Sequence, residues 1–432
     1  MAQEEINLRT PKLYDNVLYS INVEPTNIIL TRYLYIKDEV EIALLAAILN
    51  KSEDALYWAY ELYHSGFQVR FFELIWQIYY EFFAILNPSL EAYFLRKYDD
   101  WIKFKEDIYV SIFIENLLIR PYNTDVFLIK HVVKMFEIET IYCANSEHCE
   151  LEADAQIKMC IDIQNFRSLA HYILTYVQND FTSMYEFYQK VIDIINMNAL
   201  TDSFDNIDTS AADSRVKFRP TSIPNRVKLL KDFANLNRYI PVTKVILLSK
   251  ILTLFTDSSN KGRNFYVQVD KDNVQSYNTI RHIDGKAYTV LREEATYQID
   301  KRFLHLFKSS RSMLADPLNT LRYNWLYFAS FSPIWFERIQ RYCGFVDYTR
   351  KEVRFIYEFD FEKFYSMYNY EYDEMGKNII ENILPNYETI DNQYNWIDFY
   401  NKYKNVNLLI EVVYQIEFAA VALYTKGKSL IP

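Results

Sequence analysis

The chain has 432 residues, half of them apolar, and a formal net charge of −10. That length holds two or three domains with a sizeable core, and the acidic balance is a poor global match for nucleic acid. Glycine supplies six residues against 38 tyrosines and 30 phenylalanines, so loops that cradle phosphate are scarce and nucleotide chemistry is disfavoured.

Residues 1–35 predict an irregular N-terminal arm, with Pro11 and Pro25 as breaks. From residue 36 the apolar residues recur with helical spacing. We expect helices near 37–50, 52–65, 68–86, 89–103, 105–119 and 123–138. The expected caps are Ser52, Ser89 and Asn123 or Thr124 at helix starts, and Gly66 in a left-handed turn at the end of the second helix.

The predicted helix 68–86 has an apolar face wider than one partner helix needs, which is typical of a helix packed between neighbours. The joints between these helices are very short, and short joints favour antiparallel stacking. Further helices are expected near 150–160, 163–178 and 181–198. Residues 36–200 therefore predict a domain of stacked antiparallel helical hairpins.

Residues 201–223 are polar, small and aperiodic, and they predict a polar and basic linker. Residues 224–432 predict a mixed, mostly helical domain with β hairpins near 263–292 and 345–360. Its helices are expected near 224–236, 241–256, 298–308, 318–342, 374–383, 393–403 and 405–425, with Pro333 kinking or splitting the fourth of these. The predicted fold class is mainly α, with a small β element in the C-terminal half (α+β).

A cluster of cysteine and histidine is the first candidate for metal chemistry. Cys143, His148, Cys149 and Cys160 lie within 18 residues, with His171 beyond. Thiolates and imidazoles at this density suit a tetrahedral zinc ion. The cluster lacks a paired C-x2-C spacing, however, and free cysteines in a loop beside a core cysteine give the same pattern.

Glu61 and His64 form an E-x-x-H pair on one helix face. Di-iron sites of the ferritin-like class need two such motifs, and no second one occurs in the chain. The favoured interpretation is a solvated glutamate, with a histidine near the helix C-terminus where its cation suits the helix dipole.

Glu358, Asp360 and Glu362 alternate with aromatic residues. In a strand these carboxylates would share one face, as a divalent metal ion requires. An edge strand with a wet acidic face explains the alternation as well. We therefore expect no metal and no cofactor from these patterns.

A basic run lies at the end of the expected linker. It holds Arg215, Lys217, Arg219, Arg226, Lys228 and Lys231. Such an arm can engage nucleic-acid phosphates or an acidic protein, and it can equally be a solvated linker beside an amphipathic helix.

The established catalytic motifs are missing from the sequence. It contains no G-x-x-x-x-G-K-[ST], G-x-G-x-x-G, G-x-S-x-G or H-E-x-x-H. The sequence therefore gives no support for a P-loop NTPase, a Rossmann oxidoreductase, an α/β-hydrolase or a zincin. An active site scattered over the chain without a motif stays open.

Two segments resemble uncharacterised proteins of nucleocytoplasmic large DNA viruses (giant viruses). The first is SEDALYWAYELYHSGF (Ser52–Phe67), which continues into FFELIWQIYYEFFAILNP, and the second is RYNWLYFASFSPIWFERIQRYCGF (Arg322–Phe345). Together they cover about a seventh of the chain. The resemblance implies no catalytic residues. The residues that would characterise the family in these segments are Trp58, Tyr60, Tyr63, Trp325, Ser332, Pro333, Trp335 and Arg338. These residues also fit a packing role, in which a Ser-Pro break seats one Trp-rich helix against another.

The leading hypothesis is a non-enzymatic viral interaction or scaffold protein, such as a minor capsid or internal component of the virion. Its partners would be viral or host proteins, bound through exposed aromatic anchors with a polar rim. The candidate anchors are Trp58, Tyr60, Tyr63, Trp325, Trp335 and Arg338.

The expected location is the host cytoplasm (viral factory) or the virion. The N-terminus lacks the order of a secretion signal, and no apolar run reaches the about 18 residues that span a bilayer. One alternative is a factor that binds RNA or single-stranded DNA through residues 215–231. The other is a metal-dependent enzyme without a recognisable motif.

Overall fold

The computed structural model describes residues 28–135, 149–204, 225–256, 265–272, 274, 300, 303–307, 317–368 and 395–405. The protein is mainly α with one small antiparallel β element in the described part, which confirms the predicted fold class. No helix of the described part is long and apolar enough to cross a membrane.

Contacts divide the chain into two compact units, each built from two stretches of sequence. Unit 1 comprises residues 1–72 and 269–392, and unit 2 comprises residues 73–268 and 393–432. This division differs from the expected linker at 201–223. Helix α10 (Phe181–Phe204) runs into that linker, and it packs in unit 2 against α11 (Arg226–Leu236), which follows it. The two flanking helices stay together because Phe233 of α11 stacks on aromatic rings of α10.

Unit 1 begins with a helical hairpin of α2 (Lys37–Leu49) and α3 (Asp54–His64). Strong helix formers fill α2, and nearly all its residues are buried. Ser52 accepts a hydrogen bond from the Asp54 N–H at 3.3 Å, but the N-cap of α3 is Glu53, so Ser52, the predicted cap, lies one residue before the cap position. Gly66 adopts φ +92° after α3, so the predicted left-handed turn is confirmed.

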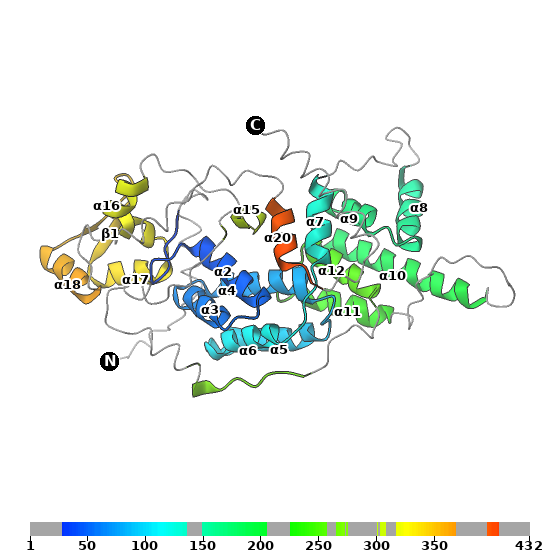
Figure 1. Cartoon of the computed structure of the whole chain (residues 1–432), viewed down its shortest axis with the longest axis horizontal. Coiled ribbons are helices and arrows are strands. Elements are labelled where there is room, and N and C mark those ends of the chain that lie inside the picture. The colour runs from blue at the N-terminus through cyan, green and yellow to red at the C-terminus, as the bar shows by residue number, and fades with distance from the viewer. Residues whose placement is uncertain are drawn as a thin grey trace, which may run out of the picture. The chain divides into compact units, whose positions relative to one another are not determined.

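The second stretch of unit 1 carries α15 (Leu304–Phe307), α16 (Pro317–Ala329), α17 (Pro333–Arg341), β1 (Gly344–Asp347), β2 (Glu352–Phe355) and α18 (Glu358–Tyr368). Pro333 splits the expected helix 318–342, because Ser332 is the N-cap and Pro333 the first residue of α17. Strands β1 and β2 form an antiparallel hairpin in which Phe345 opposes Arg354. In Figure 1 α16, α17, α18 and β1 lie together, in yellow and orange.

The second hairpin, expected at 263–292, lies mostly outside the described residues, and residues 265–272 form no strand. The interpretation of residues 358–362 as a strand is wrong, because this segment opens α18. On a helix Glu358 and Glu362 share a face but Asp360 does not, so the three carboxylates cannot line one side. The expected helices at 374–383 and 405–425 fall outside the described residues.

Unit 2 opens where α4 (Gln68–Ile78) continues into a π-helical turn, η1 (Tyr79–Phe83). The turn closes with the Ala84 N–H donating to the Tyr79 carbonyl at 2.8 Å, in place of the single helix expected over 68–86. It brings Glu81 into the interior, where Lys130 donates to that carboxylate at 2.7 Å. This charge is therefore compensated.

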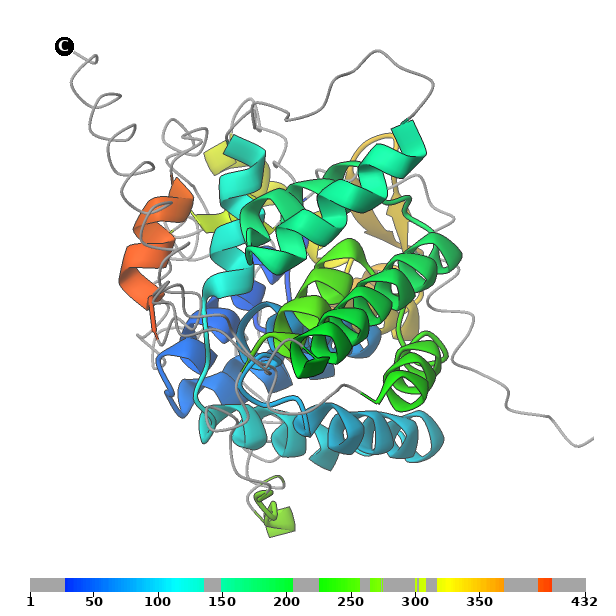
Figure 2. The ribbon, with the colours of Figure 1, turned by 90° about the vertical axis from the view of Figure 1, so that its right-hand side faces the viewer.

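The rest of unit 2 is a set of packed helices. They are α5 (Leu90–Phe104), α6 (Ile108–Leu118), α7 (Asp125–Met135), α8 (Cys149–Asp162), α9 (Phe166–Thr175), α10, α11, α12 (Lys244–Leu254) and α20 (Asn395–Tyr403). Figure 2 shows α10 beside α11 and α12. Asn123 accepts the Asp125 N–H at 2.8 Å before α7, as predicted, whereas the side chain of Ser89 makes no capping bond at α5.

Candidate functional site

A buried loop at residues 28–36 organises the polar interior of unit 1. Eight of its nine residues are buried, although loops usually run over the surface. The loop satisfies its own backbone by folding on itself: Thr31 N–H donates to the Tyr35 carbonyl at 2.8 Å and Leu34 N–H to the Thr31 carbonyl at 2.9 Å. Leu34 adopts φ 65°, a left-handed conformation that a branched residue rarely takes.

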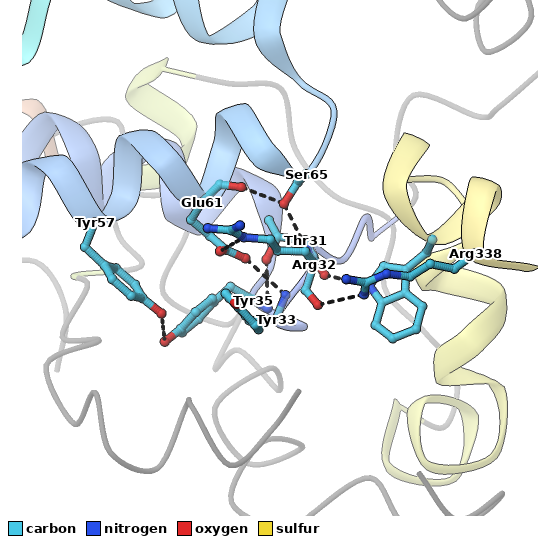
Figure 3. Close-up of polar contacts among 9 residues, drawn as sticks. Thr31, Arg32, Tyr33, Tyr35, Tyr57, Glu61, Ser65 and Arg338 are labelled. Carbon is cyan, nitrogen blue, oxygen red and sulfur yellow. Dashed lines mark hydrogen bonds and ion pairs between the residues drawn. The ribbon is translucent and has the colours of Figure 1, made fainter. Parts of the chain in front are cut away.

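Glu61 of α3 receives the loop. Its carboxylate accepts from Arg32 Nε at 2.9 Å and from the Tyr33 N–H at 3.1 Å (Figure 3). The side chains of Arg32 and Glu61 are 6% and 0% exposed, so this is a fully desolvated ion pair. The E-x-x-H interpretation of Glu61 as a solvated carboxylate is therefore wrong. His64, one turn later, stacks on Tyr60 at a centroid distance of 5.5 Å.

Ser65 ties the loop to the end of α3. Its hydroxyl donates to the Glu61 carbonyl at 2.6 Å and accepts from the Arg32 N–H at 2.9 Å (Figure 3). The Ser65 carbonyl in turn accepts from the Ile334 N–H of α17 at 3.4 Å. A small hydroxyl thus satisfies polar groups of the loop and of α3.

Helix α17 packs against the same loop. We call the contact of loop 28–36, the end of α3 and the start of α17 the junction. Trp335 Nε1 donates to the Thr31 carbonyl at 3.0 Å, and Arg338 Nη1 donates to the Arg32 carbonyl at 3.5 Å. A Cβ placed on Gly66 would lie 2.5 Å from the Cβ of Pro333, so the turn after α3 touches the start of α17. The segments Ser52–Phe67 and Arg322–Phe345 therefore meet in space through Ser65, Gly66 and Pro333.

This packing corrects the expected role of the aromatic anchors. Trp58, Tyr60, Tyr63, Trp325 and Trp335 are at most 6% exposed. Trp325 and Trp335 pack edge to face, with centroids 5.5 Å apart. A buried ring cannot anchor a partner, so these five residues are core residues of unit 1, and only Arg338 among the candidates stays half-buried.

Charge is unbalanced at the junction. Two guanidinium groups, those of Arg32 and Arg338, face the single carboxylate of Glu61, which Arg32 and the Tyr33 N–H already occupy. Arg32 Nη2 is buried and donates to no group among the described residues. Burial lowers the pKa of the Arg338 guanidinium below its ordinary value, with Arg32 adding to the decrease while Tyr368 and Tyr33 oppose it. A buried cation without its own counter-ion is costly.

Four of the large apolar side chains that unit 1 exposes lie close together in sequence, on the β hairpin and at the start of α18, while Val69, Tyr323, Tyr348 and Met367 are exposed in this unit as well. Phe345, Ile356, Tyr357 and Phe359 are 49% to 65% exposed, and we call these four residues the hairpin ridge. Phe345 opposes Arg354 in the hairpin, and Ile356 directly follows the end of β2, where its N–H donates to the Cys343 carbonyl at 3.4 Å.

The end of β2 packs against α18. Phe355, whose neighbour in sequence is Ile356, turns inward and packs against Phe361 and Phe364 of α18 at centroid distances of 5.7 and 5.0 Å. Ile356 follows in the bend between β2 and α18, and its side chain is exposed. The sequence showed that apolar residues alternate over 345–360, but it did not show which face of the hairpin α18 covers.

The hairpin turn beside the ridge is basic. Asp347 Oδ1 accepts from the backbone N–H groups of Thr349 and Arg350, both at 3.1 Å, and this fixes the turn. The side chains of Arg350 and Lys351 are exposed and take part in no ion pair of the described residues. The ridge therefore has cations at the hairpin turn, while the acidic Glu358 and Asp360 flank Phe359 in the first turn of α18.

The cysteine and histidine candidates do not form a metal site in the described part of the chain. Cys143 and His148 lie outside the described residues, as does the side chain of Cys149. Cys160 is a free cysteine on α8, and burial raises its pKa. His171 on α9 has both ring nitrogens buried without a partner. No group of three metal-ligating side chains occurs among the residues described.

The basic run is only partly described, because Arg215, Lys217 and Arg219 lie outside the described residues. Arg226 pairs with Asp193 of α10 through two hydrogen bonds, at 2.5 and 3.2 Å, so this cation is already neutralised. Lys228 and Lys231 are exposed on α11.

An open cleft of about 540 Å³ lies between α8 and α10 in unit 2. Its rim is made of exposed charged residues, and Lys190 pairs across it with Asp154 at 2.6 Å. Small-molecule sites combine apolar walls with a few buried, convergent polar groups. This cleft lacks such groups, so it does not supply an active site.

No family model matches the chain, and neither the curated proteins nor the solved structures contain a detectable relative.

Proposed function

We propose that this chain is a non-enzymatic interaction protein that recognises another protein through the hairpin ridge. The observation that carries the proposal is the exposure of Phe345, Ile356, Tyr357 and Phe359 in a unit that buries its tryptophans. Clustered exposed apolar residues rimmed by charge are typical of a protein-contact surface, whereas single ones are ordinary.

The chemistry of the ridge favours a partner with an apolar groove and a rim of mixed charge. Aromatic rings supply large contact area at low entropic cost, and a tyrosine adds a hydroxyl for the polar edge. Arg350 and Lys351 at the turn would meet acidic groups of that partner. Sequence motifs for catalysis are missing, so recognition is the activity that the described residues support best.

A role in a large DNA virus belongs to the proposal as its biological setting. It is supported by the resemblance of residues 52–67 and 322–345 to giant-virus proteins, and by the composition rich in residues with AT-rich codons. The partner would then be a viral or host protein in the virion or the viral factory. The proteome of purified particles tests the virion version, which fails if the chain is missing there.

The ridge is tested with two matched double variants. Tyr357→Ser/Phe359→Ser removes ridge contacts, and Val227→Ser/Ile163→Ser removes equally exposed apolar side chains from unit 2. Proteins captured by the tagged full chain are quantified by mass spectrometry. A partner that is lost with the first variant and kept with the second supports the proposal. Capture that is equal for both variants contradicts it.

A second candidate function is binding of single-stranded nucleic acid, and the exposed Lys228 and Lys231 on α11 favour it. Binding should weaken as salt rises and should fall in Lys228→Gln/Lys231→Gln. An electrophoretic shift assay with RNA and DNA oligonucleotides measures both effects. Absence of a shift at low salt would exclude this candidate.

A further inference from the structure

Arg338 uses only one of its hydrogen-bond donors within the described residues. It reaches from α17 to the Arg32 carbonyl, and this 3.5 Å bond uses Nη1 alone (Figure 3). Its Nε and Nη2 donate to no described group. A guanidinium carries five donors in a planar fork that matches a carboxylate or phosphate. Most of the binding capacity of this side chain is therefore unused.

Two aromatic rings hold the guanidinium in position. Its central carbon lies 4.5 Å from the Trp335 ring centroid and 4.9 Å from that of Tyr368. The two centroids are 5.6 Å apart and their planes meet at 63°, so the rings form the walls of a corner rather than a sandwich. The corner restricts the arginine before any ligand arrives, and restriction in advance reduces the entropic cost of binding.

The charges nearby leave room for one anion. Glu61 is already bound by Arg32 and the Tyr33 N–H, and Figure 3 shows the Arg32 guanidinium turned toward it. Arg341, the next cation of α17, is paired with Glu337 at 2.9 Å. Arg32, Glu61 and Arg338 together thus carry one excess positive charge, next to an Arg32 Nη2 that is buried without a partner.

We propose that Arg338, in the corner of Trp335 and Tyr368, is an oxyanion-binding site that receives a carboxylate or phosphate group. The anion would accept from the fork of Arg338 and neutralise the excess charge of the junction. Arg338 is half-buried, and apart from the Nη1 bond to the Arg32 carbonyl its fork donates to no described group. The site does not depend on the hairpin ridge or on its proposed partner.

The test is a titration of the full-length protein with sodium acetate and, separately, with inorganic phosphate. Sodium chloride at matched ionic strength is the reference. The readout is hydrogen–deuterium exchange of peptides from α17 and from loop 28–36. We expect saturable protection of both segments with at least one of the two oxyanions. Protection by acetate identifies a carboxylate site and protection by phosphate a phosphate site.

Three variants localise the effect. Arg338→Gln removes the charge, and Arg338→Lys keeps a cation for the aromatic corner but loses the fork, so it remains informative if the first variant misfolds. Both should weaken the response roughly tenfold or more. Arg341→Gln on the same helix, and Tyr357→Ser/Phe359→Ser at the ridge, should leave it unchanged. No saturable response beyond chloride, or an equal response in Arg338→Lys, overturns the proposal.

Discussion

Gly66→Ala should destabilise unit 1, because it adds a side chain at a left-handed turn that has no room for one. Gly66 has φ +92°, and an L-residue in the left-handed region costs about 1–2 kcal/mol. The new Cβ would lie 2.5 Å from Pro333 Cβ and 2.9 Å from Pro333 Cγ, both impossible contacts. Relieving such overpacking costs about 1–3 kcal/mol. The expected loss is therefore about 2–5 kcal/mol.

The steric part of this loss can be separated from the backbone part. In a Pro333→Gly background the opposing Cβ and ring are missing, so the Gly66→Ala penalty should fall to the backbone cost of about 1–2 kcal/mol. Lys351 adopts φ 57° in an exposed turn of the same unit, and Lys351→Gly measures a backbone cost without a clash.

Urea unfolding supplies the assay, with hydrogen exchange of α3 and α17 to locate the change in unit 1, because a chain of two units need not unfold in one step. Equal penalties in the wild-type and Pro333→Gly backgrounds would refute the contact between Gly66 and Pro333. A penalty below about 1 kcal/mol would refute the left-handed turn as well.

Three further predictions concern buried charge, pH and metal. Glu61→Gln leaves Arg32 buried without its counter-ion and should cost about 3–5 kcal/mol in urea unfolding, whereas Glu61→Leu/Arg32→Met should cost clearly less; equal losses would contradict the ion pair. Burial, with Arg167 adding, lowers the pKa of His171, so the unfolded chain takes up its proton more readily and stability should fall as pH drops below about 6.5. In His171→Phe the urea midpoint should depend less on pH between pH 7.5 and 5 than in the wild-type chain. An unchanged pH dependence would contradict this. Elemental analysis of the purified protein should find no stoichiometric zinc, and EDTA should leave the unfolding curve unchanged; one zinc ion per chain would revive the site at Cys143–Cys160.

Glycine, proline and capping residues at the helix ends made most helices of the described part predictable. Gly66, Pro333 and Asn123 act on their immediate neighbours, so a turn, a helix start and a cap follow from residue type alone. The misplaced strand at 358–362 also had a readable signal. Glu358 and Asp360 lie in the first turn of α18, where negative charge suits the helix dipole, and this outweighed the alternation of aromatic residues.

The candidate site was less predictable, because its contacts join residues far apart in the chain. Arg32 and Glu61 are hydrogen-bonded although they lie 29 residues apart in sequence, and Trp335 and Thr31 although they lie 304 residues apart. In a chain so rich in aromatic residues, a tryptophan gives no indication of whether it is buried. The resemblance singled out the segments that meet at the junction, but it could not show that their rings face inward and that the exposed ridge begins at Phe345.

The most direct test of protein recognition through the ridge is the dissociation constant of the captured partner. It should be measured with the wild-type chain, Tyr357→Ser/Phe359→Ser and Val227→Ser/Ile163→Ser. Two exposed aromatic anchors at about 1–2 kcal/mol each predict a loss of affinity of roughly 30-fold or more for the ridge variant, and no change for the unit 2 variant. Unchanged affinity of the ridge variant, with both variants folded, would contradict the account.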